Sequence, residues 1–165
     1  MYMRLALDQA KTALAEGEFP VGCVLVAGGR VIATGRRAHS RGAAVNELDH
    51  AEIVALRQLD GTGGHPAQVT AYSTMEPCLM CFGALLLAGV TRIVYALEDV
   101  MGGVASSLDC SRLAPLYRDA AVSVVSGVCR QDALILFTDF FNNPRNSYWQ
   151  GSLLARHILA ESSRI

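Results

Sequence analysis

The amino-acid sequence predicts a single α/β domain in which helices cover both faces of a five-stranded mixed sheet. Two β-rich segments flank the Gly28-Gly29 pair, which is a typical turn of an antiparallel hairpin. Helix and strand patterns then alternate along the chain, as they do in α/β domains. The length of 165 residues fits one domain, and a hydrophobic content of 52% is enough for a sizeable core.

The first part of the chain carries a helix, the hairpin and a second helix. Periodic apolar residues predict an amphipathic helix over 2–16. Mostly apolar runs predict strands over 21–27 and 30–34, on either side of the Gly-Gly pair. A polar loop then leads to a helix from 50 to about 59, for which Asp49 is the expected N-cap.

The rest of the chain alternates strands and helices. Residues 61–66 are rich in glycine, which predicts a loop. Apolar and β-branched runs predict three more strands, over 69–74, 92–97 and 121–125. The helix expected over 77–88 is apolar almost all round, which predicts that it is buried. Further helices are expected within 109–118, where Pro115 interrupts the pattern, and over 130–141 and 151–162.

Two short motifs indicate a metal site. Residues 50–52 read His-Ala-Glu, and residues 77–81 read Pro-Cys-Leu-Met-Cys. Zinc prefers four tetrahedral ligands, and His50, Cys78 and Cys81 supply three of them. The fourth position is then left open, which is typical of a catalytic site, because a water bound there becomes acidic near neutral pH.

The spacing of these residues explains how they could converge. Cys78 and Cys81 are three apart and therefore share a helix face, and Pro77 suits the first turn of that helix. Cys78 then lies at a helix N-terminus, where the dipole favours a thiolate. His50 and Glu52 are two apart and do not share a face. They converge only if the metal lies off the end of their helix, so two helix N-termini should point at one metal.

Other interpretations of the cysteine pair remain open at this point. Cys-x-x-Cys also occurs as a redox dithiol or as half of a structural zinc site. In a structural site Cys23, Cys110 or Cys129 could supply a fourth ligand. Glu52 favours the catalytic interpretation, since a structural site has no use for an acid–base carboxylate.

Charge and cysteine content limit the partners and the compartment. A net charge of −1 gives no overall attraction for nucleic acid. Arg36, Arg37 and Arg41 form a local basic cluster that could contact phosphates or could simply be solvated. Five cysteines and no visible signal peptide favour a cytoplasmic location. The longest apolar stretch, over 82–90, is too short to span a membrane.

The motifs and the strand order resemble those of the zinc-dependent cytidine deaminase superfamily. Within it, the chain is most similar to bacterial tRNA wobble-adenosine deaminases and next to small guanine deaminases. The residues that carry the resemblance lie at 19–24, 50–56, 76–81, 83–84, 98–99, 103, 106–108 and 139–141. The resemblance runs from about residue 3 to 141, and it implies the three-layer α/β/α cytidine-deaminase-like fold.

The resemblance also implies roles for individual residues. His50, Cys78 and Cys81 would hold one catalytic Zn²⁺ per chain. Glu52 would be the catalytic residue, moving protons from water to a ring nitrogen and to the leaving ammonia. The residues expected to bind the substrate are Ala51, Pro77, Val21, Arg37 and Asn46. Superfamily members are usually dimers or higher oligomers, so we expect a homodimer.

The chain departs from the tRNA enzymes in ways that bear on the substrate. In those enzymes an Asn that binds the target base follows the second strand, whereas residues 34–39 here read Thr-Gly-Arg-Arg-Ala-His. Asn46 could replace it from further along the loop. We expect no counterpart of residues 142–165 in the family, and Trp149 could close a pocket, cover a dimer seam or simply pack.

These observations predict a hydrolytic zinc deaminase of a nucleobase-type ring. The resemblance favours adenosine at the wobble position of tRNA as the substrate. The alternative is a free base, nucleoside or related heterocycle, as for a guanine deaminase. A non-catalytic binding subunit is a third hypothesis, against which the intact Glu52 argues. We expect residues 1–141 to form the deaminase domain and residues 142–165 to form a helical extension packed on it.

Overall fold

A computed structural model describes residues 1–42, 44–59 and 68–164. Its centre is a five-stranded sheet in the order β2 (Arg30–Arg36), β1 (Gly22–Ala27), β3 (Val69–Met75), β4 (Val90–Leu97) and β5 (Ser123–Val125). β1 runs antiparallel to both of its neighbours, β2 and β3, whereas β4 runs parallel to both of its neighbours, β3 and β5. The expected mixed sheet is therefore confirmed. The loop expected over 61–66 lies outside the described residues.

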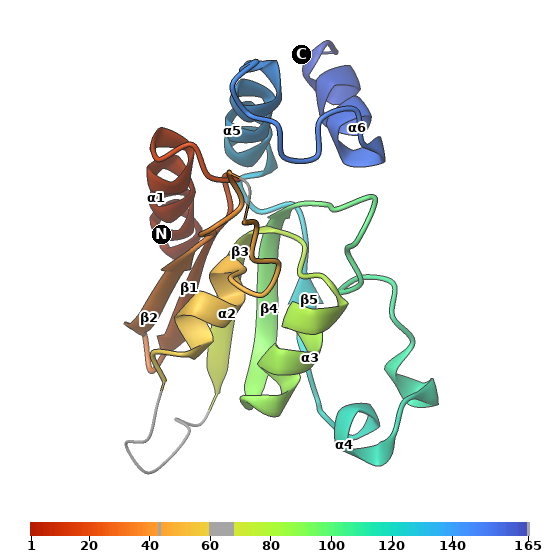
Figure 1. Cartoon of the computed structure of the whole chain (residues 1–165). Helices are drawn as coiled ribbons and strands as arrows, with labels where there is room; N and C mark the ends of the chain where they lie inside the picture. The colour runs from red at the N-terminus through yellow and green to blue at the C-terminus, as the bar shows by residue number, and fades with distance from the viewer. Residues whose placement is uncertain (43, 60–67, 165) are drawn as a thin grey trace.

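Helices cover both faces of the sheet, so the fold has the expected three layers (Figure 1). α1 (Tyr2–Ala15) and α5 (Arg130–Asn142) pack on one face and contact each other. α2 (Ala51–Leu56) and α3 (Leu79–Leu87) pack side by side on the other face. Each layer buries its apolar side against the sheet, which is the arrangement that stabilises α/β domains.

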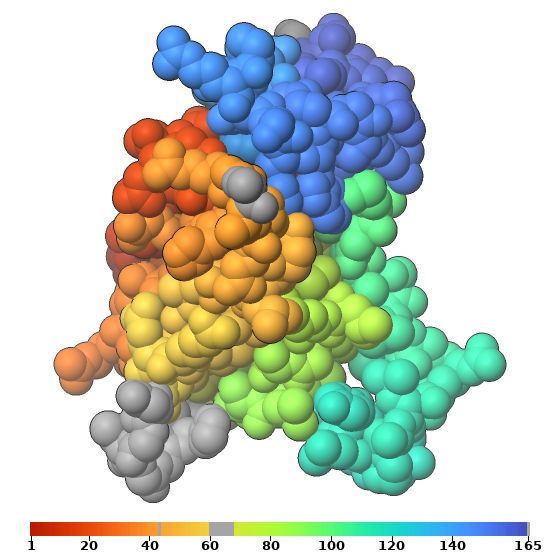
Figure 2. All heavy atoms as spheres, viewed as in Figure 1, coloured from red at the N-terminus to blue at the C-terminus, as the bar shows by residue number. Residues whose placement is uncertain are grey.

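The chain that follows β4 contains the remaining helices. A 3-10 helix (Cys110–Arg112) and α4 (Pro115–Arg118) lie between β4 and β5. α6 (Leu153–Ser162) packs on α5 and buries three apolar side chains: Leu154, Ala155 and Ile158. The C-terminal residues, blue in Figure 2, lie against the orange residues that follow β2 and the green residues that follow β4. Of the helices in the described ranges, none has both the length and the apolar character needed to cross a bilayer.

Two proline positions differ from expectation. α3 begins at Leu79 with Cys78 as its N-cap, so Pro77 precedes the helix instead of lying in its first turn. Pro115 begins α4 and does not interrupt a helix. A proline fits the first helical position because its missing N–H would have no partner there in any case. Pro115 therefore begins a helix, whereas Pro77 lies two residues before one.

The start of α2 also differs from expectation. His50 is the N-cap, not Asp49, and the helix ends at Leu56. The Asp49 carboxylate accepts hydrogen bonds from Arg57 Nη1 at 2.7 Å and from Asn46 Nδ2 at 2.6 Å. These bonds hold the loop before α2 and engage the oxygens that would otherwise cap the helix.

Gly35 sets the distance between β2 and α2. A Cβ atom at this position would lie 2.0 Å from the backbone oxygen of Ala51 and 2.6 Å from the backbone nitrogen of Ala55. The absence of a side chain therefore lets the first turn of α2 rest directly on the strand. This close packing fixes the position of His50 at the start of the helix.

Candidate active site

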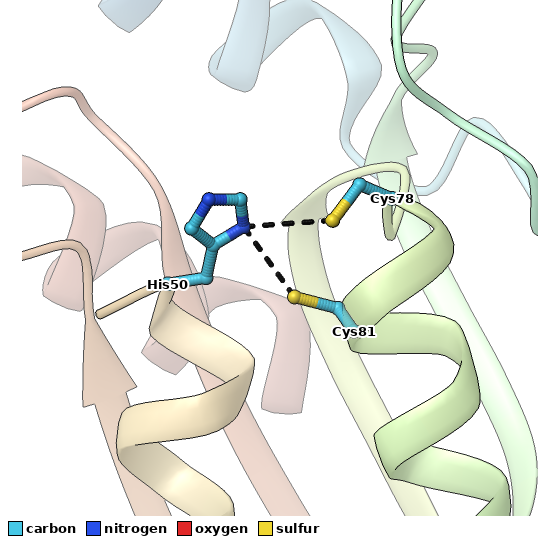
Figure 3. Close-up of side chains that lie close together, drawn as sticks. All are labelled: His50, Cys78 and Cys81. Atoms are coloured by element: carbon cyan, nitrogen blue, oxygen red, sulfur yellow. Dashed lines mark hydrogen bonds between the residues drawn. The ribbon is translucent and has the colours of Figure 1, made fainter. Parts of the chain in front are cut away.

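The starts of α2 and α3 bring three metal-ligating side chains together (Figure 3). His50 caps α2, Cys78 caps α3, and Cys81 lies in the first turn of α3. His50 Nδ1 is 3.6 Å from the Cys78 sulfur and 3.4 Å from the Cys81 sulfur. One ligand atom from each of the three residues lies within 4.8 Å of the others. The sequence prediction that two helix N-termini converge is confirmed.

The donor set and its dimensions fit zinc. Zn–N and Zn–S bonds of about 2.0 and 2.3 Å at a tetrahedral angle place nitrogen and sulfur about 3.5 Å apart. Both nitrogen–sulfur distances lie within about 0.1 Å of that separation. A hydrogen bond from Cys81, together with His50, lowers the pKa of the Cys78 thiol to about 4. Cys78 is therefore a thiolate at neutral pH, which is the form that binds metal.

The other cysteines do not join this group. Among the described residues, the cluster able to hold a metal contains His50, Cys78 and Cys81 and no fourth protein ligand. Cys23 is fully buried in β1, and burial raises the pKa of its thiol. The described residues therefore do not assemble a structural four-ligand site. They supply three ligands and leave the fourth position open, as in a catalytic site.

Glu52 is a buried carboxylate beside the metal ligands. It lies in the first turn of α2 and is 3% exposed. The Ser73 hydroxyl on β3 donates a 2.8 Å hydrogen bond to Glu52 Oε1. Burial raises the pKa of the Glu52 carboxyl, and the bond from Ser73 opposes that rise. A raised carboxyl pKa suits a group that must both accept and release a proton near neutral pH.

These side chains open into one cavity with most of the expected substrate-binding residues. The described residues that line the cavity are Phe19, Val21, Arg37, His50, Ala51, Glu52, Met75, Glu76, Cys78, Asp99, Gly102, Tyr148, Trp149 and Leu154. Pro77 and Asn46 are absent from this set. The Asn46 side chain instead binds Asp49 and accepts a hydrogen bond from the backbone N–H of Leu48 at 3.0 Å.

The C-terminal segment forms one wall of the cavity. Tyr148 packs edge-on against Phe19, with ring centroids 5.3 Å apart, and its hydroxyl donates a 2.8 Å hydrogen bond to Glu47 Oε2. Trp149 packs against Tyr148 and has a left-handed φ of 56°. This backbone conformation costs a non-glycine residue roughly 1–2 kcal/mol. Trp149 lines the cavity and is 37% exposed, which fits closing the pocket better than packing in the core.

A second wall comes from the loop after β4. The Glu76 carboxylate accepts hydrogen bonds from the Ser106 backbone at 3.0 Å and from the Asp99 backbone at 3.3 Å. These bonds hold Asp99 and Gly102 at the cavity, where burial raises the pKa of the Asp99 carboxyl. No role at the site was predicted from the sequence for Glu76, Asp99 or Gly102.

The basic cluster after β2 is matched by carboxylates. Arg36 forms two hydrogen bonds to Glu16, of 3.0 and 2.9 Å, and Arg41 lies 3.3 Å from Glu18. Arg37 is buried and lines the cavity. Because Arg36 and Arg41 already have anionic partners, the cluster is less available to phosphates than its sequence suggests.

The sequence matches known deaminases over most of its length. Residues 1–97, which include Glu52 and the three candidate ligands, match the family described as the cytidine and deoxycytidylate deaminase zinc-binding region. A tRNA-specific adenosine deaminase of Bacillus subtilis is 34% identical over 148 residues, which cover 88% of this chain and 89% of that protein. The corresponding protein of Streptococcus pyogenes is 30% identical over 164 residues, covering 98% and 92%. This alignment includes the C-terminal residues, so the expectation that they have no counterpart in the family was wrong.

Solved structures show the same fold. A deaminase that edits adenosine to inosine at the wobble position of tRNA superposes with a TM-score of 0.65 at 30% identity. The match covers 82% of this chain and 97% of that one. A guanine deaminase from Nitrosomonas europaea gives a TM-score of 0.64 at 24% identity, covering 84% and 82%, and shares the fold.

Proposed function

The chain belongs to the zinc-binding cytidine and deoxycytidylate deaminase family, and on this premise we propose that it replaces an exocyclic amine of a nucleobase-type ring with oxygen. The observation that carries the proposal is that Glu52, His50 and Cys78 line one cavity, with the Cys81 sulfur beside them as the third candidate ligand. When bound, zinc supplies a Lewis acid that makes water nucleophilic near neutral pH. The protein must then position the ring and move the protons.

We assign the proton transfers to Glu52. Its carboxylate takes a proton from the attacking water and gives it to a ring nitrogen. It then takes the second proton, from the hydroxyl now on the attacked carbon, and gives it to the amine as the carbon–nitrogen bond breaks, so that the products are an oxo ring and ammonia. Such general acid–base catalysis is typically worth about a hundred- to ten-thousand-fold in rate. Cys78 caps α3, so the positive end of that helix dipole lies beside the site and favours negative charge there.

A small ring compound is the substrate that the geometry supports best. Tyr148 and Trp149 wall the cavity, and all three nearby arginines are paired with carboxylates. A free base, nucleoside or related heterocycle needs no phosphate contacts. Adenosine in tRNA is the second candidate, because curated relatives that are 30–34% identical are tRNA-specific adenosine deaminases.

The test compares both candidates on one preparation. The zinc-loaded full chain is assayed for ammonia release from a panel of amino-substituted bases and nucleosides. It is also assayed for inosine formation in an anticodon stem-loop by mass spectrometry. We expect ammonia from at least one small compound, and we expect none from Glu52→Ala with zinc retained. Inosine alone would select the second candidate, and neither product at one zinc per chain would refute deamination.

We also propose a homodimer in the cytoplasm. Leu79, Leu87 and Leu116 are 62%, 57% and 67% exposed, and they lie on α3 and α4. α3 and α4 are in contact, and large exposed apolar side chains on neighbouring helices are typical of protein interfaces. Sedimentation of the wild type and of Leu79→Glu tests the dimer, and dissociation is expected in the variant.

The proposal of a cytoplasmic location is supported by the cysteines. All five are free thiols, which fits a reducing compartment.

A further inference from the structure

Glu47 lies between the metal ligands and the cavity wall that the C-terminal segment forms. Its Oε2 atom accepts a 3.1 Å hydrogen bond from Arg37 Nη2 and a 2.8 Å hydrogen bond from the Tyr148 hydroxyl. The same oxygen lies 4.0 Å from His50 Nε2. One carboxylate oxygen therefore contacts three parts of the site: the residue that follows β2, the N-cap of α2 and the segment that follows α5.

Arg37 fixes the position of this carboxylate. The Arg37 side chain is 2% exposed, and its Nη1 donates to the backbone oxygens of Ala38 and Asn46 at 3.0 and 2.8 Å. The guanidinium also lies 5.6 Å from the centroid of the Tyr148 ring. A planar guanidinium held in this way points Nη2 in one direction, and hydrogen bonds between charged groups are the strong ones. The Glu47 side chain is 55% exposed, but its carboxylate is anchored by Arg37.

The His50 ring is sensitive to a charge at this position. Its Nδ1 faces both cysteine sulfurs, whereas Nε2 points away from them (Figure 3). A neutral imidazole carries one proton, so Nδ1 is free to bind a metal only when that proton is on Nε2. The 4.0 Å separation from Glu47 Oε2 is longer than a hydrogen bond, so the carboxylate acts through its charge. That charge favours the Nε2–H tautomer and one orientation of the ring.

We propose that Glu47 is a positioning residue that couples the C-terminal wall to the metal site. Arg37 and Tyr148 hold the Glu47 carboxylate, and the carboxylate holds the His50 ring with Nδ1 toward the sulfurs. Carboxylates beside metal-binding histidines act in this way in other proteins. The inference rests on the metal ligands of the proposed function and is independent of the reaction. It implies that a change in the wall alters metal affinity.

The first test measures zinc affinity without any substrate. The metal-free full chain is titrated with zinc against a chromophoric chelator. We expect Glu47→Gln, which keeps the size of the side chain and removes its charge, to weaken zinc binding about tenfold. Glu16→Gln is the matched control: Glu16 also pairs with an arginine, Arg36, but is not among the described residues that line the cavity. Wild-type zinc affinity in folded Glu47→Gln would overturn the proposal.

A double-mutant cycle tests whether the wall acts through Glu47. Tyr148→Phe removes one hydroxyl and should weaken zinc binding about threefold, the effect of one hydrogen bond. In the Glu47→Gln background it should have no further effect, because the charge that the hydroxyl positions is gone. Tyr2→Phe is the control, since its hydroxyl donates to the Gly29 backbone. Equal losses in both backgrounds would overturn the coupling, as would wild-type affinity in Tyr148→Phe alone.

The visible spectrum of the cobalt-substituted protein separates ligand geometry from folding. We expect the absorption bands to differ from those of the wild type in Glu47→Gln and in Tyr148→Phe, and to be unchanged in both controls. Circular dichroism checks that each variant is folded. Weaker metal binding with an unchanged spectrum would assign the loss to general stability and would overturn the positioning role.

Metal binding and turnover separate this inference from the proposed function. Weaker zinc binding in Glu47→Gln without ammonia release by the zinc-loaded wild type would leave Glu47 as a positioning residue and refute deamination. Ammonia release by the wild type together with unchanged zinc affinity and cobalt spectra in the variants would do the reverse.

Discussion

At the scale of single residues, the hydroxyl of Ser73 supports the catalytic carboxylate. It is fully buried and donates to Glu52 Oε1. We expect Ser73→Ala to lower kcat about tenfold with unchanged zinc content, because a buried carboxylate loses a hydrogen bond worth about 1.5 kcal/mol. Steady-state kinetics and metal analysis of the same preparation would measure both effects.

Thr74→Val provides the control for this prediction. Thr74 is equally buried on the same strand, but its Oγ1 accepts a 3.0 Å hydrogen bond from the Gly22 backbone and does not contact Glu52. Thr74→Val should lower the melting temperature and leave kcat within about twofold of the wild-type value. If both variants lowered kcat equally, the effect of Ser73 would have to be attributed to the strand and not to its hydroxyl.

Some site residues were predictable from the sequence and others were not, for a physical reason. His50, Cys78 and Cys81 belong to two short motifs, and the start of a helix fixes the direction of each side chain. Ser73 and Tyr148 reach the site through tertiary packing. Their positions depend on strand pairing and on the path of the chain after α5, which no local spacing encodes.

At the scale of elements, the contact between β2 and α2 determines the position of the metal ligands. Gly35→Ala would place a Cβ atom 2.0 Å from a backbone oxygen of α2. We expect α2 to shift, with a loss of about 1–3 kcal/mol of stability, typical of overpacking. The zinc content after dialysis should fall below one per chain, measured by atomic emission alongside urea unfolding.

Gly83→Ala is the matched control at the other metal helix. Gly83 lies within α3, and among the described residues no heavy atom beyond its chain neighbours and its own helix backbone would come within 4 Å of an added Cβ. Alanine is favoured over glycine in a helix by about 0.5–1 kcal/mol. This variant should keep its zinc and unfold at slightly higher urea concentration; zinc loss here as well would show that the metal site tolerates no change in either helix.

Element types were more predictable than element boundaries. The Gly28-Gly29 turn and the alternating apolar runs identified all five strands, because those patterns depend on neighbouring residues. The start of α2 was misplaced by one residue because the Asp49 carboxylate is engaged by Arg57 and Asn46. Those partners come from tertiary structure, which competes with the local capping preference.

At the scale of the whole molecule, an ion-pair network ties the C-terminal helices to the sheet. Glu98, which follows β4, accepts hydrogen bonds from Arg130 Nε at 2.8 Å and from His157 Nε2 at 3.1 Å. Arg130 also pairs with Glu161 on α6 at 3.2 Å. Arg130 and, to a lesser extent, His157 lower the pKa of the Glu98 carboxyl to about 2. One carboxylate thereby links β4, α5 and α6.

This network should weaken in acid. An unfolded glutamate titrates near pH 4.3, so the stabilisation is complete above about that pH and is lost as the pH falls toward 2. Glu98→Gln should lower the melting temperature at pH 7 by a few degrees. It should also flatten the decline of melting temperature between pH 5 and pH 2, as scanning calorimetry would show.

Asp139→Asn is the control for the acid prediction. Asp139 is a carboxylate on α5 that forms no ion pair with the described residues. Its melting curve should parallel that of the wild type at every pH. Parallel curves for Glu98→Gln as well would mean that the network contributes no pH-dependent stability.

The wall formed by Tyr148 and Trp149 has a consequence for how such a protein can evolve. The metal ligands and Glu52 lie within residues 1–97, which match the family, whereas this wall is encoded far downstream. Bond-breaking chemistry and one wall of the binding cavity are therefore encoded on separate stretches of one gene. Recombination or drift in the terminal stretch can alter which compound is accepted while the older reaction is preserved.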